Sequence, residues 1–469
     1  MVVVHHFQDI IESLSDVYNL PSYKENRLKL EFSEQDNASP VYVGATPPLP
    51  FAESEVFHVK VVESRRLTAV DGDCKAIYEA TFDVEGSNFN FKAGDTIGVI
   101  PHNVESEVNF IINHLGLTSR ADLCYTLSVD SSVKGSKIPA HTPVKSTLRH
   151  VLTNCLDLRS ILKKLFLLAL SKYTKNERER KILEYLSSKE GSPSYTNHIL
   201  NKGLCLLDIF TIFNSCKPPI EVLLANLPRL LPRPYSIVHS GLENKRISIC
   251  FSVMTVNNRK GLTTGWLENI ILNKELSLEK QIENLNLSGA GLKNKVPIFL
   301  RKNINMFCLP DNMEVPLILI GPGTGVSPFI GFLEERECFK ACNPEKKLGE
   351  TLLFFGCRHP ELDFIYKEEL NGLLSRGVLN MLCTAFSRIE NEERKYIQDA
   401  LKQYGKDLIN LINDGARIYI CGDLKTMAAQ VKDVLVKCFI EHENMTIEEA
   451  NTRISEMQKD KRYLVDAWS

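Results

Sequence analysis

A short glycine-rich loop constrains the fold of this chain more than any other feature. Residues 321–325 read Gly-Pro-Gly-Thr-Gly, follow the apolar run 316–320 and precede the apolar segment 326–333. This order predicts a buried strand, a loop almost free of side chains, and a helix whose first N–H groups have no partner. Such a loop lets a pyrophosphate approach the backbone and the helix N-terminus. The spacing is shorter than the usual GxGxxG fingerprint, so a tight fit of helix on sheet is the alternative at this point.

The C-terminal third of the chain alternates regularly between strand and helix patterns. Strands are expected at 317–320, 352–355, 380–386 and 417–421, and helices at 363–376, 393–413 and 424–442. Apolar strands separated by helices predict a doubly wound parallel α/β sheet, which binds ligands at the carboxyl ends of its strands. The residues that follow the four strands are therefore expected along one rim: Gly321, Gly356, Ser387 and Gly422.

Upstream, β-rich segments surround a block with helical spacing. Strands are expected at 57–61, 77–82, 96–101, 234–239 and 246–255, and helices within 106–218. We therefore expect an antiparallel β domain in two parts, at 51–105 and 219–310, with an inserted helical domain at 106–218. Residues 1–50 are expected to be a leader or linker with one short helix around Asp9–Tyr18, and residues 311–469 form the α/β domain.

Composition narrows the class of protein. The 469 residues are 43% hydrophobic and 24% charged, as in soluble proteins of two or three domains. A net charge of -2 gives no long-range attraction to nucleic acid or acidic lipid, so neither a nucleic acid nor a membrane is an expected partner. The thirteen cysteines form no CxxC pair and several lie in apolar runs. This usage predicts reduced thiols in a cytoplasmic protein and no metal site.

Two segments of the β domain carry groups that suit a nucleotide with a planar ring. Residues 233–236 read Arg-Pro-Tyr-Ser: an arginine for a phosphate, a tyrosine to stack on a ring and a serine to bond a ring nitrogen. Alone, this segment is better explained by a surface arginine and a buried tyrosine. Residues 261–264, Gly-Leu-Thr-Thr, open a helix and suit a second anion, or form a simple cap. With the loop at 321–325, these turns indicate two nucleotides.

Cations and the chain end gather at the expected rim of the parallel sheet. Ser387 and Arg388, with Arg394 or Lys395, suit a ribose 2′-phosphate and hence NADPH, although a solvated helix start is the plainer explanation. A terminal tryptophan such as Trp468 normally anchors a tail, but here it could end over a nicotinamide–flavin contact.

Together, these motifs resemble the FAD/NADPH half of the diflavin reductases related to cytochrome P450 reductase. The resemblance covers roughly residues 51–469 and keeps many motifs in order: 233–236, 261–264, 321–328, 355–358, 387–388, 396–398 and 421–423. Within the family, the segments 232–236, 264–267 and 461–469 are most similar to the branch that reduces methionine synthase. The resemblance implies a ferredoxin–NADP reductase-like fold, with an FAD-binding β-barrel, an inserted helical connecting domain and an NADPH-binding domain.

The resemblance also implies residue roles. FAD contacts are implied for Arg233, Pro234, Tyr235, Ser236, Gly261, Leu262, Thr263, Thr264 and Trp468. NADP contacts are implied for Lys75, Gly321, Gly323, Thr324, Gly325, Arg336, Ser387, Arg388, Lys395, Tyr396, Ile397, Gln398 and Asp423. Ser236, Cys421 and Asp466 are expected around nicotinamide C4 and flavin N5, with Trp468 stacked on the flavin. Two positions depart from the family pattern: Ser327 replaces the usual alanine, and Gln430 replaces an acidic NADPH contact and is left unassigned.

The implied function is hydride transfer from NADPH to FAD. In complete family members, electrons continue to FMN in a flavodoxin-like domain and then to cobalamin on methionine synthase. That FMN domain is expected before residue 1, and residues 1–50 do not replace it. Two alternatives are a P450-reductase-type enzyme with another acceptor and a truncated chain that binds flavin without catalysis.

Overall fold

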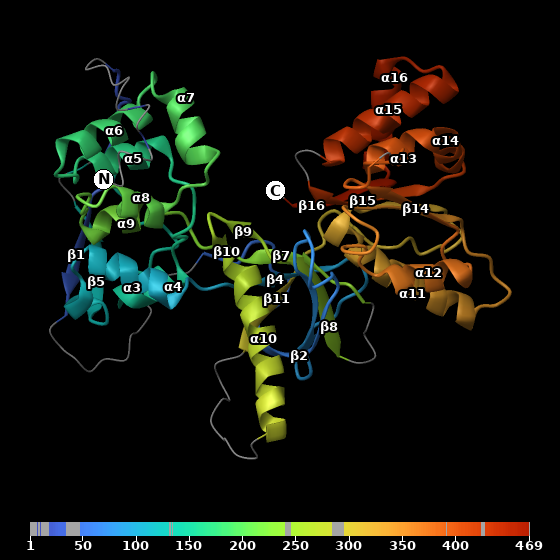
Figure 1. Ribbon diagram of the computed structural model, residues 1–469, viewed down its shortest axis with the longest axis horizontal. Coiled ribbons are helices and arrows are strands. Elements are labelled where there is room, and N and C mark those ends of the chain that lie inside the picture. The colour runs from blue at the N-terminus through green and yellow to red at the C-terminus, as the bar shows by residue number, and fades with distance from the viewer. Residues whose placement is uncertain are drawn as a thin grey trace. The chain divides into compact units, whose positions relative to one another are not determined.

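The computed structural model describes residues 7, 10, 18–33, 47–130, 133, 135–239, 245–283, 295–390, 392–423 and 427–468, without the side chains at 274–283, 423, 467 and 468. The chain divides into two compact units. The first comprises Met1–Leu49, Pro101–Pro232 and Thr255–Leu262, and the second comprises Pro50–Ile100, Arg233–Met254 and Thr263–Ser469. Figure 1 draws both units, which are described separately below.

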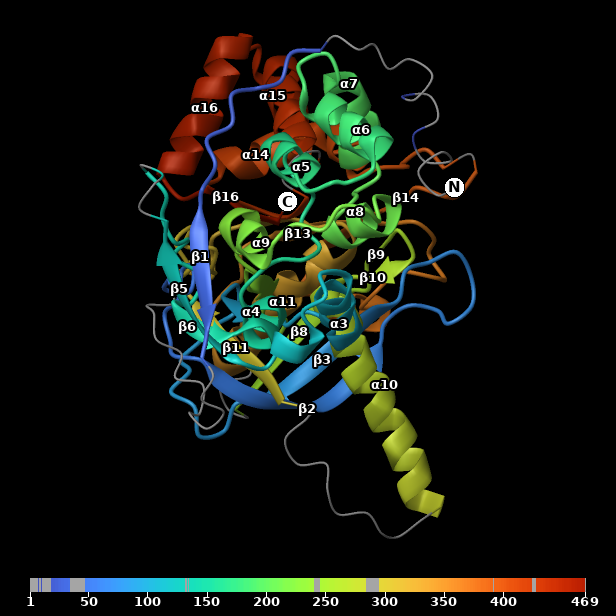
Figure 2. The same ribbon diagram turned by 90° about the vertical axis from the view of Figure 1, so that its left-hand side faces the viewer.

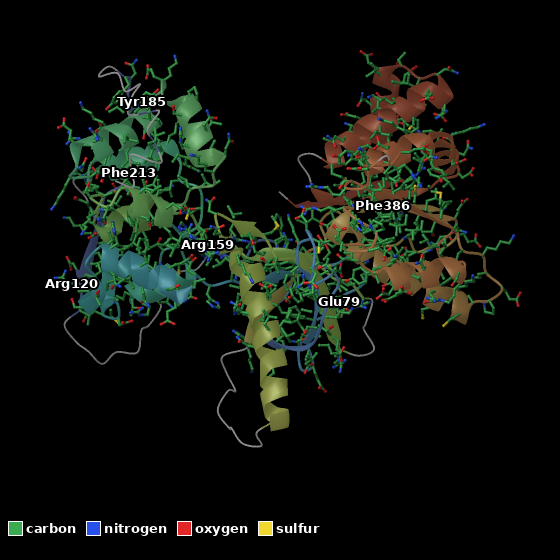
Figure 3. The ribbon with its side chains drawn as sticks, viewed as in Figure 1. Glu79, Arg120, Arg159, Tyr185, Phe213 and Phe386 are labelled. Atoms are coloured by element: carbon green, nitrogen blue, oxygen red, sulfur yellow. The ribbon has the colours of Figure 1, made fainter. Side chains whose placement is uncertain are left out.

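The first unit is mainly helical. Its elements are β1 (Leu28–Phe32), α3 (Glu105–His114), η1 (Thr118–Arg120), β5 (Cys124–Val129), β6 (Lys145–Thr147), α4 (Leu148–Asn154), α5 (Lys164–Ser171), α6 (Glu177–Ser187), α7 (Ser192–Tyr195), η2 (Thr196–Leu200), α8 (Leu206–Ile212), α9 (Ile220–Asn226), β9 (Thr255–Val256) and β10 (Arg259–Lys260). Their apolar faces form one core, which includes Phe213, labelled in Figure 3. Leu156 ties two distant parts of this unit together: its carbonyl accepts from Asn103 Nδ2 at 2.6 Å, and its backbone bridges to Arg229.

The expected leader contains a strand. β1 pairs with β5 in an antiparallel sheet of order β1-β5-β6, as Figure 2 shows. Leu28, Leu30 and Phe32 pack on the core of the first unit, so the strand follows a period of two that is too short to stand out in the sequence. Of the helix expected around Asp9–Tyr18, only Ile10 and Tyr18 lie within the described residues.

The expected boundaries of the helical block also differ from the division of the chain. Residues 106–218 include β5 and β6, and the helical unit continues through α9, which was expected to belong to the β domain. The apolar residues of α9 are buried in the helical core, which draws this segment away from the antiparallel sheet.

The second unit begins with a six-stranded antiparallel sheet. Its strands are β2 (Phe57–Arg66), β3 (Ile77–Asp83), β4 (Thr96–Val99), β7 (Arg233–Ser236), β8 (Arg246–Ser252) and β11 (Lys295–Arg301), in the order β7-β4-β11-β2-β3-β8. Just beyond β7, Ile237 bridges to Ile249 of β8, and Val238 N–H donates to Ser248 O at 2.9 Å. The first turns of α10 (Leu262–Glu283) pack on the apolar side chains of this sheet, and its later turns extend away from it (Figures 1 and 2).

A five-stranded parallel sheet completes the second unit, as expected for a doubly wound α/β domain. Its strands are β12 (Leu317–Ile320), β13 (Thr351–Cys357), β14 (Met381–Phe386), β15 (Arg417–Asp423) and β16 (Tyr463–Trp468), in the order β14-β13-β12-β15-β16. Leu317 and Leu319 pack on the side of α11 (Ser327–Cys342) and α12 (Lys367–Ser375). Ile318 and Ile320 pack on the side of α13 (Ile397–Gln403), α14 (Gly405–Asn413), α15 (Ala429–Glu443) and α16 (Ile447–Lys459).

β16 was not expected as a strand, because only three consecutive residues, 463–465, mark it as β-rich. Its pairing with β15 brings Asp466 opposite Cys421. None of the described helices is long and apolar enough to cross a membrane.

Candidate active site

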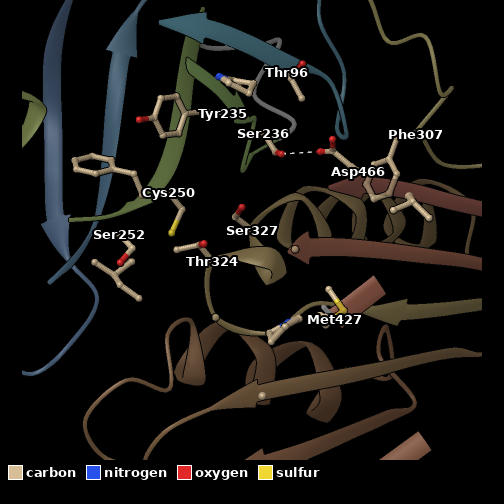
Figure 4. Close-up of a pocket in the computed structure, with 18 of the residues that line it drawn as sticks. Thr96, Tyr235, Ser236, Cys250, Ser252, Phe307, Thr324, Ser327, Met427 and Asp466 are labelled. Atoms are coloured by element: carbon tan, nitrogen blue, oxygen red, sulfur yellow. Dashed lines mark hydrogen bonds between the residues drawn. The ribbon is translucent and has the colours of Figure 1, made fainter. Parts of the chain in front are cut away.

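One cleft of about 1390 Å³ lies within the second unit, between the antiparallel sheet and the carboxyl ends of the parallel strands. Thr96, Tyr235 and Ser236 line it from the first side, and Thr324 and Asp466 from the second (Figure 4). Pockets for one small ligand usually measure about 300–1,000 Å³. The cleft is therefore large enough to accept more than one compact ring system.

The glycine loop forms one wall of this cleft. A Cβ at Gly321 would lie 2.4 Å from Gly325 O, and a Cβ at Gly325 would lie 2.1 Å from Cys421 O. These two glycines are required by packing. Gly323 differs: its φ is +52°, and nothing lies within 4 Å of an added Cβ. The loop is thus tightly held at both ends and open at Gly323, directly before α11.

The ends of β13 and β14 form the neighbouring wall. The Asp363 carboxylate accepts hydrogen bonds from the N–H groups of Arg358, at 3.1 Å, and His359, at 2.7 Å, and so fixes the loop after β13. Ser387 N–H donates to Cys357 O at 3.0 Å, which holds Ser387 in the cleft wall. The exposed Arg388 is not part of the wall, although its N–H donates to Arg358 O at 2.9 Å.

The N-terminus of α13 resolves which of two cations faces the cleft. Arg394 Nη1 donates to Cys383 Sγ at 3.2 Å, whereas Lys395 lines the cleft with Tyr396, Ile397 and Gln398. The N–H of Tyr396 donates to Asp399 Oδ2 at 3.0 Å, so the start of the helix is capped and its position fixed. Gln398 Nε2 donates to Gln430 Oε1 at 2.7 Å, which brings the unassigned Gln430 into the same wall.

Three expected catalytic residues meet where the two sheets approach each other. The Ser236 hydroxyl donates to Asp466 Oδ2 at 2.9 Å (Figure 4), and Cys421 lies opposite Asp466 on the paired strand. Burial raises the pKa of Asp466, against the opposing effects of the Ser236 hydrogen bond and Arg301. Burial also raises the pKa of the Cys421 thiol well above its usual value, and the Asp466 carboxylate adds to this, so the thiol stays neutral.

The arginine–proline–tyrosine–serine segment forms β7, and most of it reaches the cleft. Pro234, Tyr235 and Ser236 line the wall, whereas Arg233 does not. Tyr235 lies edge-on to Phe251 with ring centroids 6.4 Å apart, and burial raises the pKa of its hydroxyl. Thr264 lines the cleft from the first turn of α10, while Gly261 and Leu262 belong to the first unit.

Arg336 does not lie at the cleft, although an NADP contact was expected for it. It is fully buried, and its guanidinium donates to Gly349 O, just before β13. The physical reason is visible in the spacing: Phe329, Phe332 and Leu333 precede it on the same buried face of α11. Lys75 does line the cleft. The side chains of Asp423 and Trp468 lie outside the described residues; their backbones pair in register.

Sequence reasoning missed a group of cleft residues that follow the antiparallel strands. The missed residues are Phe51, Cys250, Phe251, Ser252, Met254, Arg301, Lys302, Asn303, Ile304, Asn305 and Phe307. Most of them lie at or just beyond the ends of β8 and β11. The rule about carboxyl ends applies only to parallel strands, so these ends carried no comparable signal.

The cleft has binding capacity that the protein itself leaves unused. Thr263 Oγ1, at the start of α10, and Ser252 Oγ, in the cleft wall, are buried without a hydrogen-bond partner. With the open space at Gly323, they provide hydroxyl donors and two helix N-termini, which suit the phosphates of dinucleotides. In the described part of the chain, no cluster of three or more His, Cys, Asp or Glu residues could hold a metal ion.

Comparison with known proteins gives the same division of labour. Residues 49–266 match an FAD binding domain, and residues 319–433 match an oxidoreductase NAD-binding domain. The chain is 37% identical to methionine synthase reductase of Bos taurus over 430 residues, covering 88% of this chain and 61% of that protein. It is 34% identical to the Homo sapiens protein of that name over 468 residues, covering 96% and 66%. The chain therefore spans less than two thirds of the length of these relatives.

A second group of relatives broadens the comparison. The chain is 30% identical to NADPH–cytochrome P450 reductase of Musca domestica over 478 residues, covering 97% of this chain and 67% of that protein. The two matched domains give the two-domain fold of the ferredoxin–NADP reductases, and the cofactors are FAD and NADPH. The chain belongs to the family of NADPH-dependent flavoprotein oxidoreductases that includes methionine synthase reductase and NADPH–cytochrome P450 reductase.

Proposed function

We propose that this chain takes a hydride from NADPH onto FAD within the cleft of the second unit. The contact between Ser236 and Asp466, backed by Cys421, carries the proposal, because it joins the flavin-binding sheet to the nucleotide-binding sheet at one point. The proposal includes a closed six-stranded barrel for FAD, supported by the Ile237–Ile249 bridge. It also includes an inserted helical connecting domain, supported by the interruption of the second unit between Ile100 and Arg233.

The chain's own residues bind and orient the two cofactors. Tyr235, Ser236, Thr263 and Thr264 are assigned to FAD, and the N-terminus of α11 at Gly323 and Thr324 to the NADPH pyrophosphate. FAD, when bound, supplies a two-electron acceptor that receives the hydride of NADPH. Asp466 balances the positive charge that develops on the nicotinamide, while the Ser236 hydroxyl fixes its orientation. Trp468 is assigned by resemblance to the outer face of the flavin ring.

The electron acceptor belongs to the same proposal. The names of the first two relatives point to methionine synthase, with FMN in a flavodoxin-like domain and cobalamin as later stations. An alternative acceptor, as in cytochrome P450 reductases, is supported by the comparable match to the Musca domestica enzyme. A cytoplasmic location stays a prediction.

Anaerobic titration of the purified chain tests the central proposal. FAD is expected in stoichiometric amount, and NADPH is expected to bleach its absorbance within seconds. A chain that binds FAD but is not reduced by NADPH would support the non-catalytic alternative. Reduction by NADPH with a low affinity for FAD would instead leave the reaction intact and revise the flavin site.

A further prediction concerns the 2′-phosphate. Ser387→Ala and Lys395→Ala are each expected to raise the KM for NADPH about tenfold, because each removes a hydrogen bond or charge contact to that phosphate. The KM for NADH should change less than twofold. Lys402→Ala, a cation of α13 outside this cleft, is the matched control and should change neither. Equal changes for both nucleotides would contradict the assignment.

A further inference from the structure

A buried ion network lies behind the cleft wall, on residues that the proposed reaction does not use. Its centre is Glu79 on β3, which is almost fully buried and labelled in Figure 3. Glu79 Oε2 accepts from Tyr366 OH at 2.7 Å, and Glu79 Oε1 accepts from Arg65 Nε at 3.2 Å. Arg65 in turn donates to Glu369 Oε1 of α12 at 2.6 Å. The network therefore joins β2 and β3 of the antiparallel sheet to the start of α12.

His239 extends the network to a second helix of the nucleotide-binding domain. Its Nε2 lies 3.4 Å from Glu79 Oε2, and its Nδ1 lies 2.7 Å from Glu334 Oε1 on α11. His239 follows β7 by three residues, so it is fixed to the strand that carries Ser236. One imidazole thus lies between a carboxylate of the sheet and a carboxylate of α11.

The elements that the network joins also form the two walls of the cleft. Glu79 stands opposite Cys250 in the register of β3 and β8, and Cys250 lines the cleft. Ile77, two residues before Glu79 on the same face of β3, lines it as well. Across the cleft, α11 begins directly after the glycine loop. A shift of α11 relative to β3 would therefore change the width of the cleft.

Close packing of α11 makes its position sensitive to this network. A Cβ at Gly331 would lie 2.5 Å from Val238 O, so the helix contacts the backbone next to His239. Glu335 of the same helix accepts from Ala93 N–H at 3.2 Å. These contacts hold α11 at short range, and the charges at Glu334 and His239 hold its orientation.

The protonation of the network matches its geometry. Burial lowers the pKa of His239, but the hydrogen bonds and charges of Glu334 and Glu79 outweigh it and raise the pKa to about 10. Burial raises the pKa of Glu79, but His239, Tyr366 and Arg65 outweigh it and lower the pKa to about 2. At neutral pH, a cation therefore lies between two anions.

We propose that Glu79, His239 and Glu334 are positioning residues for hydride transfer: together they set the gap between the flavin-binding and nicotinamide-binding walls of the cleft. The proposal rests on the proposed function and adds to it a set of residues that touch neither cofactor. They act through α11 and β7, which carry the groups that do.

The roles of the network and of the phosphate-binding residues separate cleanly. Ser387, Lys395 and Tyr396 all belong to the α/β domain, on the far side of the network from β3. Binding of 2′,5′-ADP, which needs only those residues, is therefore independent of the gap. Hydride transfer is not, because a displacement of about 1 Å can lower a rate about 100-fold.

The experiment uses the full chain loaded with FAD and the variants Glu79→Gln, His239→Asn and Glu334→Gln. Each is expected to lower the limiting rate of anaerobic flavin reduction by NADPH about tenfold or more. The Kd for 2′,5′-ADP should stay within twofold of wild type. Glu79→Gln combined with His239→Asn should be no slower than the slower single variant, because both remove the same link. Glu63→Gln, which breaks an exposed pair with Arg246 inside the antiparallel sheet, is the control and should match wild type.

Two further readouts do not depend on the fold-wide stability of the variants. Hydrogen–deuterium exchange at residues 321–332 of the FAD-loaded chain should rise several-fold in Glu79→Gln and not in Glu63→Gln. The wild-type limiting rate should fall as pH rises toward 10, where His239 loses its charge, and His239→Asn should lack this fall. The groups around His239 are Glu79 on β3, Glu334 on α11, Arg65 on β2, Cys250 on β8, and Tyr366 and Glu369 at α12.

The outcomes are distinguishable. Variants that reduce flavin at the wild-type rate, or unchanged exchange at residues 321–332, overturn the inference. So does a loss of rate matched by an equal loss of 2′,5′-ADP binding, because that indicates general disruption. A wild-type chain whose flavin NADPH does not reduce overturns the proposed function, and the exchange data then decide whether the network still holds α11.

Discussion

An Asp466→Asn variant is expected to reduce its flavin with NADPH about 100-fold more slowly than wild type, with little change in the Kd for 2′,5′-ADP. The carboxylate lies in the cleft and accepts from Ser236 at 2.9 Å, so its charge is held at a fixed point. An amide of the same shape keeps a polar contact but removes the negative charge. Stopped-flow absorbance under anaerobic conditions gives the rate, and Asp460→Asn, an exposed residue at the end of α16, is the control.

Stability should move in the opposite direction to the rate. Because burial raises the pKa of Asp466 above its unfolded value, ionisation of this group disfavours the folded state. Its contribution to stability is greatest at acid pH and is lost as pH rises through the folded-state pKa. Asp466→Asn should therefore have a Tm at pH 7 at least equal to that of wild type, and the difference should shrink on acidification. A variant that is both slower and much less stable at pH 7 would point to a structural role instead.

Alanine substitutions at two glycines of the same loop are expected to have separate effects. Gly325→Ala places a Cβ 2.1 Å from Cys421 O, so the loop or β15 must shift, at a cost of about 1–3 kcal/mol or more. A clear fall in Tm and loss of NADPH binding should follow. Gly323→Ala meets no protein atom within 4 Å, and its φ of +52° costs about 1–2 kcal/mol.

The second variant tests the ligand side of the loop. The methyl group at residue 323 would occupy the open space beside α11 that is assigned to the pyrophosphate. Gly323→Ala should therefore raise the KM for NADPH at least tenfold while lowering the Tm less than Gly325→Ala does. Calorimetry and steady-state kinetics on both variants provide the comparison. A Gly323→Ala chain with wild-type affinity for NADPH would remove the pyrophosphate from this loop.

Some of this architecture could be predicted from local sequence and some could not. The parallel sheet follows from apolar strands that alternate with amphipathic helices, a signal that repeats over the C-terminal third. β1 and β16 were missed because each depends on a few alternating residues whose pairing partners lie far along the chain. Arg336 was misplaced because an arginine on a buried helical face looks, in sequence, like one at a surface.

The active site shows the same limit. Ser236 and Asp466 lie 230 positions apart and meet through two different sheets, which no local pattern encodes. Their roles came from resemblance to a family, not from spacing. The network around Glu79 and His239 had neither source, because its members are single charged residues in otherwise ordinary strands and helices.

The double attachment of Leu156 has a consequence for the order of folding. β4 has its sheet partners, β7 and β11, beyond residue 232, so its edges stay unpaired while the chain between them is a free loop. Closing a long loop is slow because its chain entropy must be lost first. Asn103 and Arg229, near the two ends of that loop, are both fixed to Leu156 inside the helical unit. Once this unit has formed, β4 and β7 are separated by a short effective tether, and the flavin-binding sheet can assemble as though the intervening residues were a tight turn.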